Sequence, residues 1–198
     1  MTSHLIWTRR ALGAALFALT FPLQSIAETP PKVRFQTTMG DFVVEVYPDK
    51  APKTVDNFLK YVNAKHYDGT TFHRVIPNFM VQGGGYDTKF AEKITRPPVP
   101  HEGREALAKG GPKNVVGTLA MARTNDPNSA TSQFFINVKD NAFLDPSAQQ
   151  PGYTVFGQVV SGMDIVEKIR LTPTGKGGPF PTDVPKTTVI ITSATTLK

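Results

Sequence analysis

The chain has 198 residues, of which 39% are hydrophobic and 19% are charged, with a formal net charge of +6 and no cysteine. This length fits one domain, and the composition excludes both a disordered chain and a multispan membrane protein. Without cysteine there can be no disulfide, thiolate nucleophile, Cys-ligated zinc or iron–sulfur cluster.

The N-terminal stretch has the layout of a secretory signal peptide. Arg9 and Arg10 precede an uncharged apolar run from Ala11 to Leu23, and Ser25 and Ala27 place small residues at a cleavage site. The run has 13 residues, fewer than the about 20 that a spanning helix needs. This length disfavours the two alternatives, an uncleaved anchor and a buried N-terminal helix.

We therefore expect residues 1–27 to be removed on export, which leaves residues 28–198 as the mature domain without stable membrane association. The adjacent arginines leave open whether export follows the general or the twin-arginine route. Cleavage removes two arginines and no acid, so the formal charge falls from +6 to +4. The lysines are scattered, which disfavours nucleic-acid binding.

Eight short apolar or alternating stretches between turn residues are typical of β-strands. They are Val33–Thr37, Phe42–Tyr47, Thr70–Ile76, Phe79–Gly83, Val115–Ala122, Gln133–Val138, Tyr153–Val160 and Thr187–Ala194. This pattern predicts a mainly β fold, a closed eight-stranded antiparallel barrel without exposed edges. Alternating large apolar residues predict a filled interior, which disfavours a hollow ligand barrel of lipocalin type. They include Phe42, Val44, Phe134 and Ile136.

Two stretches have helical periodicity, one beginning at Pro52 and one lying between Gly162 and Pro173. Their apolar stripes are Val55, Phe58, Leu59 and Val62, and Met163, Val166 and Ile169. We expect these two helices to cap the open ends of the barrel. The prolines between positions 97 and 100 exclude a central strand, so Gly83–Lys113 is predicted to be an irregular surface loop.

The usual catalytic motifs are absent from the sequence. The four histidines are far apart and none forms an HxxH or HExxH pair, so no metal site is expected. There is no Gly-x-Ser-x-Gly elbow and no P-loop, and Gly83-Gly84-Gly85 has the wrong spacing for a dinucleotide loop. An enzyme with this sequence therefore uses neither nucleophile, metal nor cofactor.

The most informative segment is residues 72–84, Phe-His-Arg-Val-Ile-Pro-Asn-Phe-Met-Val-Gln-Gly-Gly. Side chains alternate along a strand, so one outer face of this hairpin, with Phe79 at its corner, carries a defined set. That set is Arg74, Met80 and Gln82, and by the same alternation Phe72 and Ile76 share the face of Arg74. By the same alternation, Phe135 and Gln133 point one way while Phe134 and Ile136 point to the core.

This string resembles the signature of the cyclophilins, the peptidyl-prolyl cis/trans isomerases. The similarity continues through Gly117–Arg123, Ser132–Ile136, Phe143–Asp145 and Val155–Gly157, and the whole chain resembles the short bacterial periplasmic cyclophilins. The resemblance implies an eight-stranded barrel capped by two helices, with the site in a groove on its outer face. It also implies an enzyme of the bacterial periplasm that acts on proline-containing, unfolded or flexible polypeptides. Nothing in the sequence indicates an obligate partner, cofactor or metal, so we expect a monomer without cofactor or metal.

Carried over by position, the resemblance makes Arg74 the catalytic arginine. Gln82 would hydrogen-bond the substrate backbone and help to hold Arg74. The pocket for the proline ring would be formed by Phe79, Met80, Phe135 and Leu144. The adjacent groove would be lined by Gln133, with backbone groups near Ala122 and Arg123.

Three positions depart from the common family pattern. Phe143 stands where many members have a Trp that contributes to cyclosporin binding, so we expect weak cyclosporin affinity with retained catalysis. Tyr153 replaces a common His; it can still donate a hydrogen bond but does not titrate near neutrality. Arg123 replaces a common Asn and adds a charge that favours acidic residues near the proline.

A second functional class uses the same groove without turnover, as a binding module or holdase. The combination of Arg74 with Phe79 and Gln82 favours turnover, because a binding module does not need that arginine. Chaperone-like binding can accompany isomerisation as a secondary role.

Overall fold

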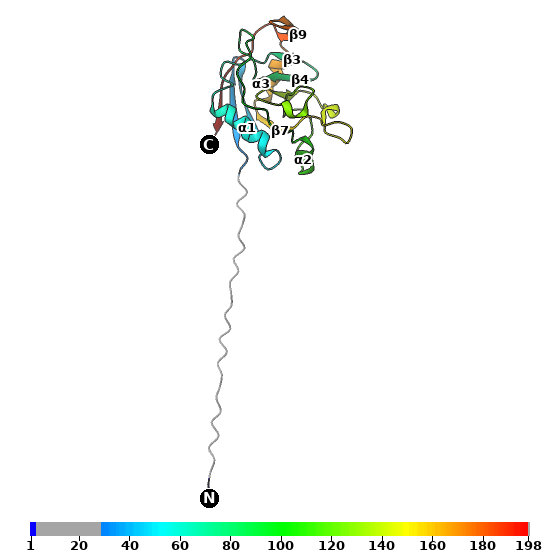
Figure 1. Cartoon of the computed structure of the whole chain (residues 1–198). Helices are drawn as coiled ribbons and strands as arrows, with labels where there is room; N and C mark the ends of the chain where they lie inside the picture. The colour runs from blue at the N-terminus through cyan, green and yellow to red at the C-terminus, as the bar shows by residue number, and fades with distance from the viewer. Residues whose placement is uncertain (3–28, 198) are drawn as a thin grey trace.

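The structure, a computed structural model, describes residues 1–2 and 29–197, which hold ten β-strands, three α-helices and two short 3-10 helices. The predicted signal peptide, apart from Met1 and Thr2, lies outside the described residues. Eight strands form one antiparallel sheet in the order β10-β1-β2-β7-β5-β6-β4-β3 (Figure 1). They are β1 (Lys32–Thr37), β2 (Gly40–Val46), β3 (Arg74–Ile76), β4 (Met80–Gly83), β5 (Thr118–Met121), β6 (Phe134–Asn137), β7 (Val155–Ser161) and β10 (Ile191–Leu197).

The sheet is curled but remains open between its edge strands β3 and β10, which form no ladder with each other. Only the chain before β3 reaches across, through a bridge of Thr71 to Ile190 and three backbone bonds around it. The Gly69 amide donates to the Ile191 carbonyl and the Ile191 amide to the Thr70 carbonyl, both at 2.8 Å, and the Phe72 amide donates to the Val189 carbonyl at 3.0 Å. The eight-stranded antiparallel sheet was predicted, but its closure into a barrel is wrong. The physical reason is that these bonds come from an irregular stretch and end at Phe72, so the strand expected from Thr70 forms a regular ladder only from Arg74, and only with β4.

The interior of the curled sheet is filled with aromatic rings. The Phe35 ring lies 5.1 Å from Phe42 and 5.4 Å from Phe134, and Phe58 lies 5.1 Å from Phe156. The four alternating residues that predicted a filled interior, Phe42, Val44, Phe134 and Ile136, are all at most 1% exposed. That prediction is confirmed, and the hollow ligand barrel is excluded.

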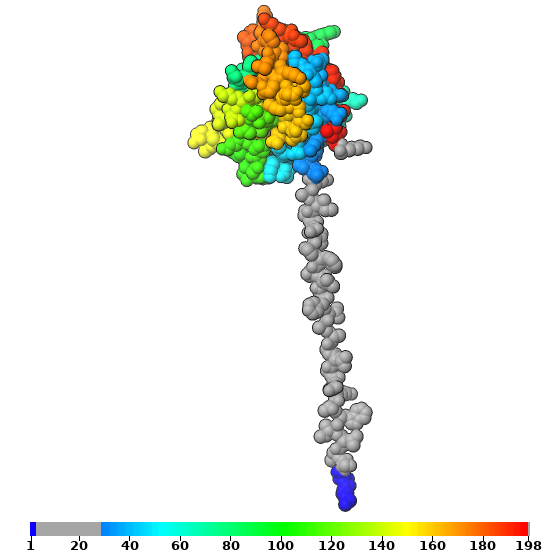
Figure 2. All heavy atoms as spheres, turned by 180° about the vertical axis from the view of Figure 1, so that it is seen from behind, coloured from blue at the N-terminus to red at the C-terminus, as the bar shows by residue number. Residues whose placement is uncertain are grey.

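Both predicted helices are present, α1 (Pro52–Asn63) and α3 (Met163–Arg170), and both add buried side chains to the interior. In Figure 2, α3 and β7 lie between the N-terminal strands and the segment that ends in β5, in agreement with the pairing of β7 to β2 and β5. Within the described residues, none of the helices combines the length and hydropathy needed to cross a membrane.

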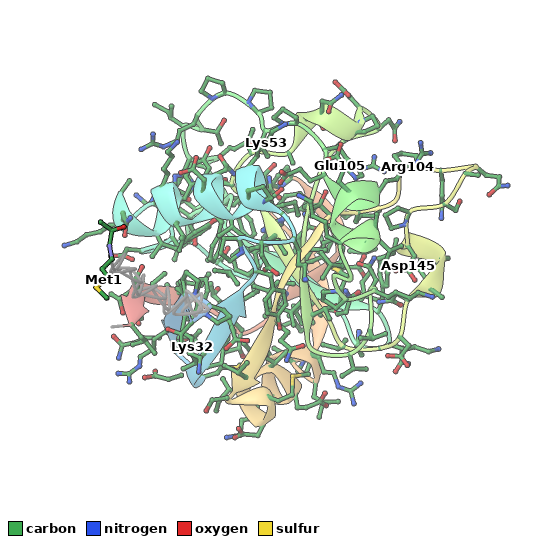
Figure 3. The ribbon with its side chains drawn as sticks, turned by 90° about the horizontal axis from the view of Figure 1, so that it is seen from below. Met1, Lys32, Lys53, Arg104, Glu105 and Asp145 are labelled. Carbon is green, nitrogen blue, oxygen red and sulfur yellow. The ribbon has the colours of Figure 1, made fainter. Side chains whose placement is uncertain are left out.

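A third helix, α2 (Gly103–Ala108), lies inside the stretch predicted to be an irregular loop. It has six residues, too few to display a helical stripe. Just before it, the buried Glu102 carboxylate accepts the Lys53 and Thr54 amides at 3.1 and 2.7 Å and so caps α1, whose own N-cap residue makes no side-chain bond. Figure 3 shows Lys53 of α1 and Arg104 and Glu105 of α2 on the same side of the molecule.

A two-stranded hairpin of β8 (Thr174–Gly177) and β9 (Phe180–Pro185) was not predicted either. It projects from the sheet near β3 and lacks the apolar alternation that marks the other strands (Figure 1). The Phe180 ring stacks on His73 at 5.5 Å and joins the hairpin to the body. The hairpin therefore depends on this packing.

Candidate active site

A second, smaller apolar cluster lies on the outer face of the sheet, separate from the interior. Its buried members come from alternate positions of neighbouring strands and from the second 3-10 helix, η2 (Ala142–Leu144). They are Met80, Ala120, Phe135, Leu144 and Val155, all at most 7% exposed. Register explains the arrangement, because Phe135 pairs with Gln82 and Ala120 and points outward while its neighbours Phe134 and Ile136 point inward.

This cluster forms the floor of a hollow of about 350 Å³, which we call the proline hollow after the role proposed below. Ten residues line it, and all ten are among the eleven predicted site residues. They are Arg74, Phe79, Met80, Gln82, Ala122, Arg123, Phe135, Phe143, Leu144 and Tyr153. None of the ten is a carboxylate, a histidine, a serine or a threonine, so the hollow offers apolar surface, amide groups, one phenol and two guanidinium groups.

The eleventh predicted residue, Gln133, lies next door and connects to the hollow through a chain of side-chain bonds. Its Oε1 accepts from Gln82 Nε2 at 3.0 Å, and Gln82 Oε1 accepts from Arg74 Nη1 at 3.4 Å. We call this chain the glutamine relay. Arg74 and Gln82 are opposite each other in the β3–β4 ladder, so the backbone register places the exposed guanidinium beside the amide.

The alternation predicted that Phe72 shares a face with Arg74, and this prediction is wrong. Phe72 is 1% exposed and belongs to the interior cluster. The regular strand begins only at Arg74, so the alternation does not extend back to Phe72. His73 between them is also buried, and its Nδ1 has no hydrogen-bond partner among the described residues. Burial, with a smaller contribution from the Arg74 charge, lowers its pKa to about 4.

Aromatic pairs form two sides of the proline hollow. Phe79 at the hairpin corner stacks with Phe143 at 5.6 Å, and Phe143 is 64% exposed at the rim. On the other side the Tyr153 ring stands edge-on to Phe135 at 5.5 Å. A flat apolar ring entering the hollow would therefore meet aromatic faces and edges on both sides.

Arg123 stands at the boundary between the proline hollow and a second hollow of about 320 Å³. Both hollows are lined by Gln82, Ala122 and Arg123. The second hollow is otherwise polar, with Glu92, Thr95, Thr124, Ser129, Thr131 and Gln133 around it. Gln133 on its wall packs closely against Gly85, where a Cβ would lie 2.5 Å from Gln133 Cγ.

A buried polar network supports the hollow from below and was not predicted from the sequence. Asn141 Nδ2 donates to the Phe79 carbonyl at 2.9 Å and to Asn137 Oδ1 at 2.7 Å. Asn137 continues to Thr118 at 3.0 Å, and Asn114 donates to Asp145 beside η2 at 2.9 Å. The network connects the Phe79 corner to η2. Its one indication in the sequence is Asn137, the polar residue that ends the apolar run of β6.

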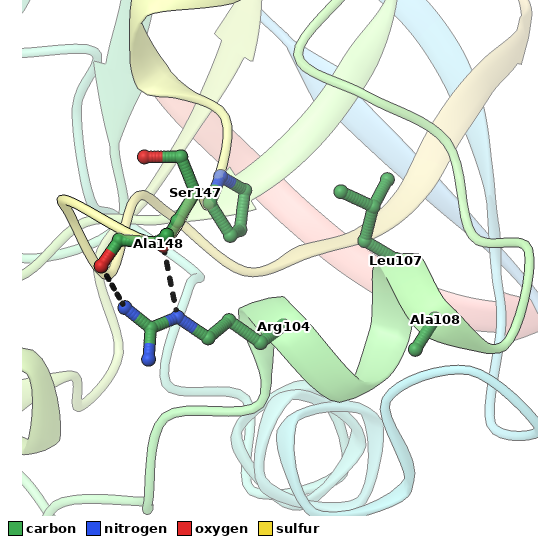
Figure 4. Close-up of a pocket in the computed structure, with 6 residues that line it drawn as sticks. Arg104, Leu107, Ala108, Ser147 and Ala148 are labelled. Atoms are coloured by element: carbon green, nitrogen blue, oxygen red, sulfur yellow. Dashed lines mark hydrogen bonds between the residues drawn. The ribbon is translucent and has the colours of Figure 1, made fainter.

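Another hollow, between α2 and the chain after η2, contains none of the predicted residues (Figure 4). Arg104 donates there to the Ser147 and Ala148 carbonyls at 3.1 and 3.5 Å, and Leu107 and Ala108 line the wall. Among residues 1–2 and 29–197, no group of three or more His, Asp or Glu residues is placed to hold a metal ion.

Comparison with known proteins supports one family. The family model described as "Cyclophilin type peptidyl-prolyl cis-trans isomerase/CLD" matches residues 32–196. A peptidyl-prolyl cis-trans isomerase of Acinetobacter baylyi is 47% identical over 93% of this chain and 94% of its own length. Peptidyl-prolyl cis-trans isomerase B of Escherichia coli K12 is 51% identical over 82% of this chain and 98% of its own.

A solved structure agrees with these relatives. The Cryptosporidium parvum cyclophilin-type isomerase, crystallised in the presence of the dipeptide Ala-Pro, superposes with a TM-score of 0.67 at 25% identity, over 84% of this chain and 99% of its own. The family match covers nearly all of residues 29–197, including all strands and helices that surround the proline hollow. The chain is therefore an enzyme that belongs to the cyclophilin-type peptidyl-prolyl cis-trans isomerases.

Proposed function

We propose that the proline hollow binds the ring of an X–Pro unit in a flexible polypeptide and that Arg74 accelerates rotation about the preceding amide bond. The observation that carries this proposal is the placement of a guanidinium at the edge of an apolar floor made by Met80, Phe135 and Leu144. The family's activity and the dipeptide present with the Cryptosporidium parvum relative support the choice of substrate.

The amide barrier explains why these residue types suffice. Conjugation of the nitrogen lone pair with the carbonyl gives a barrier of about 18–20 kcal/mol, and uncatalysed exchange takes about tens to hundreds of seconds. At the twisted transition state the conjugation is lost, and the proline nitrogen can accept a hydrogen bond. A donor that binds this nitrogen stabilises the twisted state more than either planar state, which is what lowers the barrier.

Arg74 suits this role because a guanidinium stays protonated and holds its donors in a rigid plane. The glutamine relay restrains it from one side, and the apolar floor excludes water, which strengthens the contact. A barrier lower by about 7 kcal/mol corresponds to about 10⁵-fold acceleration. No proton or electron is transferred, in keeping with a hollow that holds neither a nucleophile nor a carboxylate.

The test is NMR exchange spectroscopy on an Ala-Pro-Phe peptide with the purified protein and its Arg74→Ala and Arg74→Lys variants. We expect a loss of about 10²-fold or more for Arg74→Ala and a partial loss for Arg74→Lys, which keeps the charge but not the planar donors. Peptide binding without acceleration by the folded wild type would favour the binding module. Equal rates in all three proteins would leave the activity and exclude the role of Arg74.

The signal peptide predicted at residues 1–27 leads us to propose that the substrates are exported polypeptides that fold in a bacterial periplasm. Cell fractionation with N-terminal sequencing of the mature protein tests this, with a new terminus at Glu28 as the expected result. An intact N-terminus in the cytoplasmic fraction would refute it. We also propose weak cyclosporin binding, because Phe143 presents a smaller ring at the exposed rim than the Trp common in the family.

A further inference from the structure

The Arg123 side chain is fixed in place but its charge is not neutralised. Nε and Nη2 donate to the Gly152 carbonyl at 3.1 and 2.8 Å, and Nη1 donates to the Thr124 carbonyl at 2.8 Å. The guanidinium also lies 4.5 Å from the centre of the Tyr153 ring. These acceptors are neutral, and over residues 29–197 no carboxylate comes within 4.0 Å of Arg123. Three of the five N–H donors are used, so two remain for a ligand.

The position of Arg123 puts this charge on the path of the substrate. It lines both hollows, and the proline hollow contains two arginines and no carboxylate. Of the residues that line the two hollows, only Glu92 carries a carboxylate. It is exposed and lines the second hollow alone. Residues of an extended chain are about 3.3–3.6 Å apart, so a residue one or two positions from a bound proline lies within reach of Arg123.

We propose that Arg123 makes substrate choice charge-dependent, so that the protein turns over X–Pro segments with Asp or Glu near the proline faster than those with Lys or Arg. This inference rests on the isomerase function proposed above. The half-buried guanidinium is screened less by salt than a fully exposed one, and its planar donors match a carboxylate. Its rigid anchoring also limits the entropy lost when a carboxylate binds.

The experiment measures kcat/KM for peptides that carry Glu, Gln or Lys at the first or second position before proline, at low and high salt. At low salt we expect the wild type to prefer Glu over Lys by about three- to tenfold at one of these positions, with a smaller preference at high salt. Arg123→Gln should reduce the preference to what Arg74 alone sustains, and Arg123→Lys should retain part of it, because lysine keeps the charge but not the planar donors. A ratio close to one in the wild type, or an unchanged ratio in Arg123→Gln, would overturn the proposal.

Arg104 provides a matched control. It also donates to two backbone carbonyls, but it lines the separate hollow of Figure 4. Arg104→Gln removes the same charge and should leave the Glu-to-Lys ratio unchanged, whereas an equal loss in both variants would show that overall charge sets the preference.

Each ratio compares peptides on one protein, so a general change in activity cancels. Turnover of the Gln peptide reports on the isomerase function separately. Its absence in the wild type would refute that function and this inference together. Turnover of all peptides without charge preference would refute this inference alone.

Discussion

A single methyl group at Gly85 should displace the glutamine relay without disturbing the fold. Gly85 does not have a positive φ, so alanine can adopt its backbone conformation. A Cβ built there lies 2.5, 2.6 and 2.7 Å from Cγ, Cδ and Nε2 of Gln133. All three atoms belong to a flexible side chain, so Gln133 rather than the backbone has to move in the Gly85→Ala variant.

The size of the effect follows from these distances. Ordinary contact begins at 3.4 Å, so Gln133 must retreat by about 0.9 Å from its 2.5 Å approach. The 3.0 Å bond to Gln82 would then exceed 3.5 Å. Loss of a net hydrogen bond is worth about 0.5–1.5 kcal/mol, or about a two- to twelvefold change in rate. We expect the lower part of this range, about two- to fivefold in kcat/KM, because Gln82 restrains Arg74 only through a 3.4 Å bond.

The assay compares kcat/KM on a neutral Ala-Pro-Phe peptide with the free energy of unfolding in urea. Gly85→Ala should stay within about 1 kcal/mol of the wild type in stability, because the lower entropy of the unfolded chain offsets part of the lost bonding. Gly175→Ala is the control, since its Cβ would lie 3.4 Å from Lys186, an ordinary contact. If the relay carries the effect, Gly85→Ala should add little to Gln133→Ala. Wild-type activity in Gly85→Ala, or fully additive losses, would refute the reasoning.

Three further predictions concern the cap, a buried histidine and the rim. Glu102→Gln should lower the free energy of unfolding by about 1–3 kcal/mol, because the Thr54 amide and hydroxyl lose a charged acceptor, and an unchanged urea midpoint would contradict this. Burial lowers the folded-state pKa of His73 from 6.5 to about 4, so the fold favours the neutral ring. The free energy of unfolding should therefore be highest above pH 6.5 and should fall as the pH drops, by about 3 kcal/mol at pH 4. His73→Phe, which keeps a ring against Phe180, should flatten that decline in urea titrations, and an equally steep decline would exclude His73 as its source. Phe143→Trp should tighten cyclosporin binding about tenfold by calorimetry, and equal affinity would show that this rim position does not limit binding.

The strand alternation could be predicted because it is local. In β6 the side chains of Phe134 and Ile136 point into the interior while Phe135 points into the outer cluster, and this separation needs only the period of a strand. The same reasoning failed at Phe72, where the ladder ends and the chain bonds to Val189 instead. Alternation therefore predicts the orientation of a residue only as far as the ladder extends.

Features that depend on long-range contacts could not be predicted. α2 is too short to show a period, and its place depends on Glu102 bonding to the start of α1. The β8–β9 hairpin has no apolar face of its own and is joined to the body through Phe180 and His73. The prediction that the sheet closes failed for the same reason, because closure depends on backbone partners of the segment around Thr71 that lie far along the chain.

For the candidate site, the residues that line the proline hollow could be predicted through the family resemblance, but the polar network beneath them could not. Each member of the network, such as Asn137 or Asn141, is an ordinary polar residue until the fold buries it. The anchoring of Arg123 by the Gly152 carbonyl is invisible for a similar reason, because a backbone acceptor leaves no mark in the sequence. The residue type indicates the charge, and only the structure gives its orientation.

The division of apolar residues into two clusters explains why the site lies on the outside of the sheet. The interior is filled by packed rings such as Phe35, Phe58 and Phe134, which leaves no space for a substrate and makes substitutions there costly. The outer cluster is smaller, and its walls come from turns and loops that carry Phe79, Phe143 and Arg123. A reaction that needs a positioned guanidinium and a dry apolar surface can use these walls. Rim residues can then change the choice of substrate while the interior continues to hold the fold.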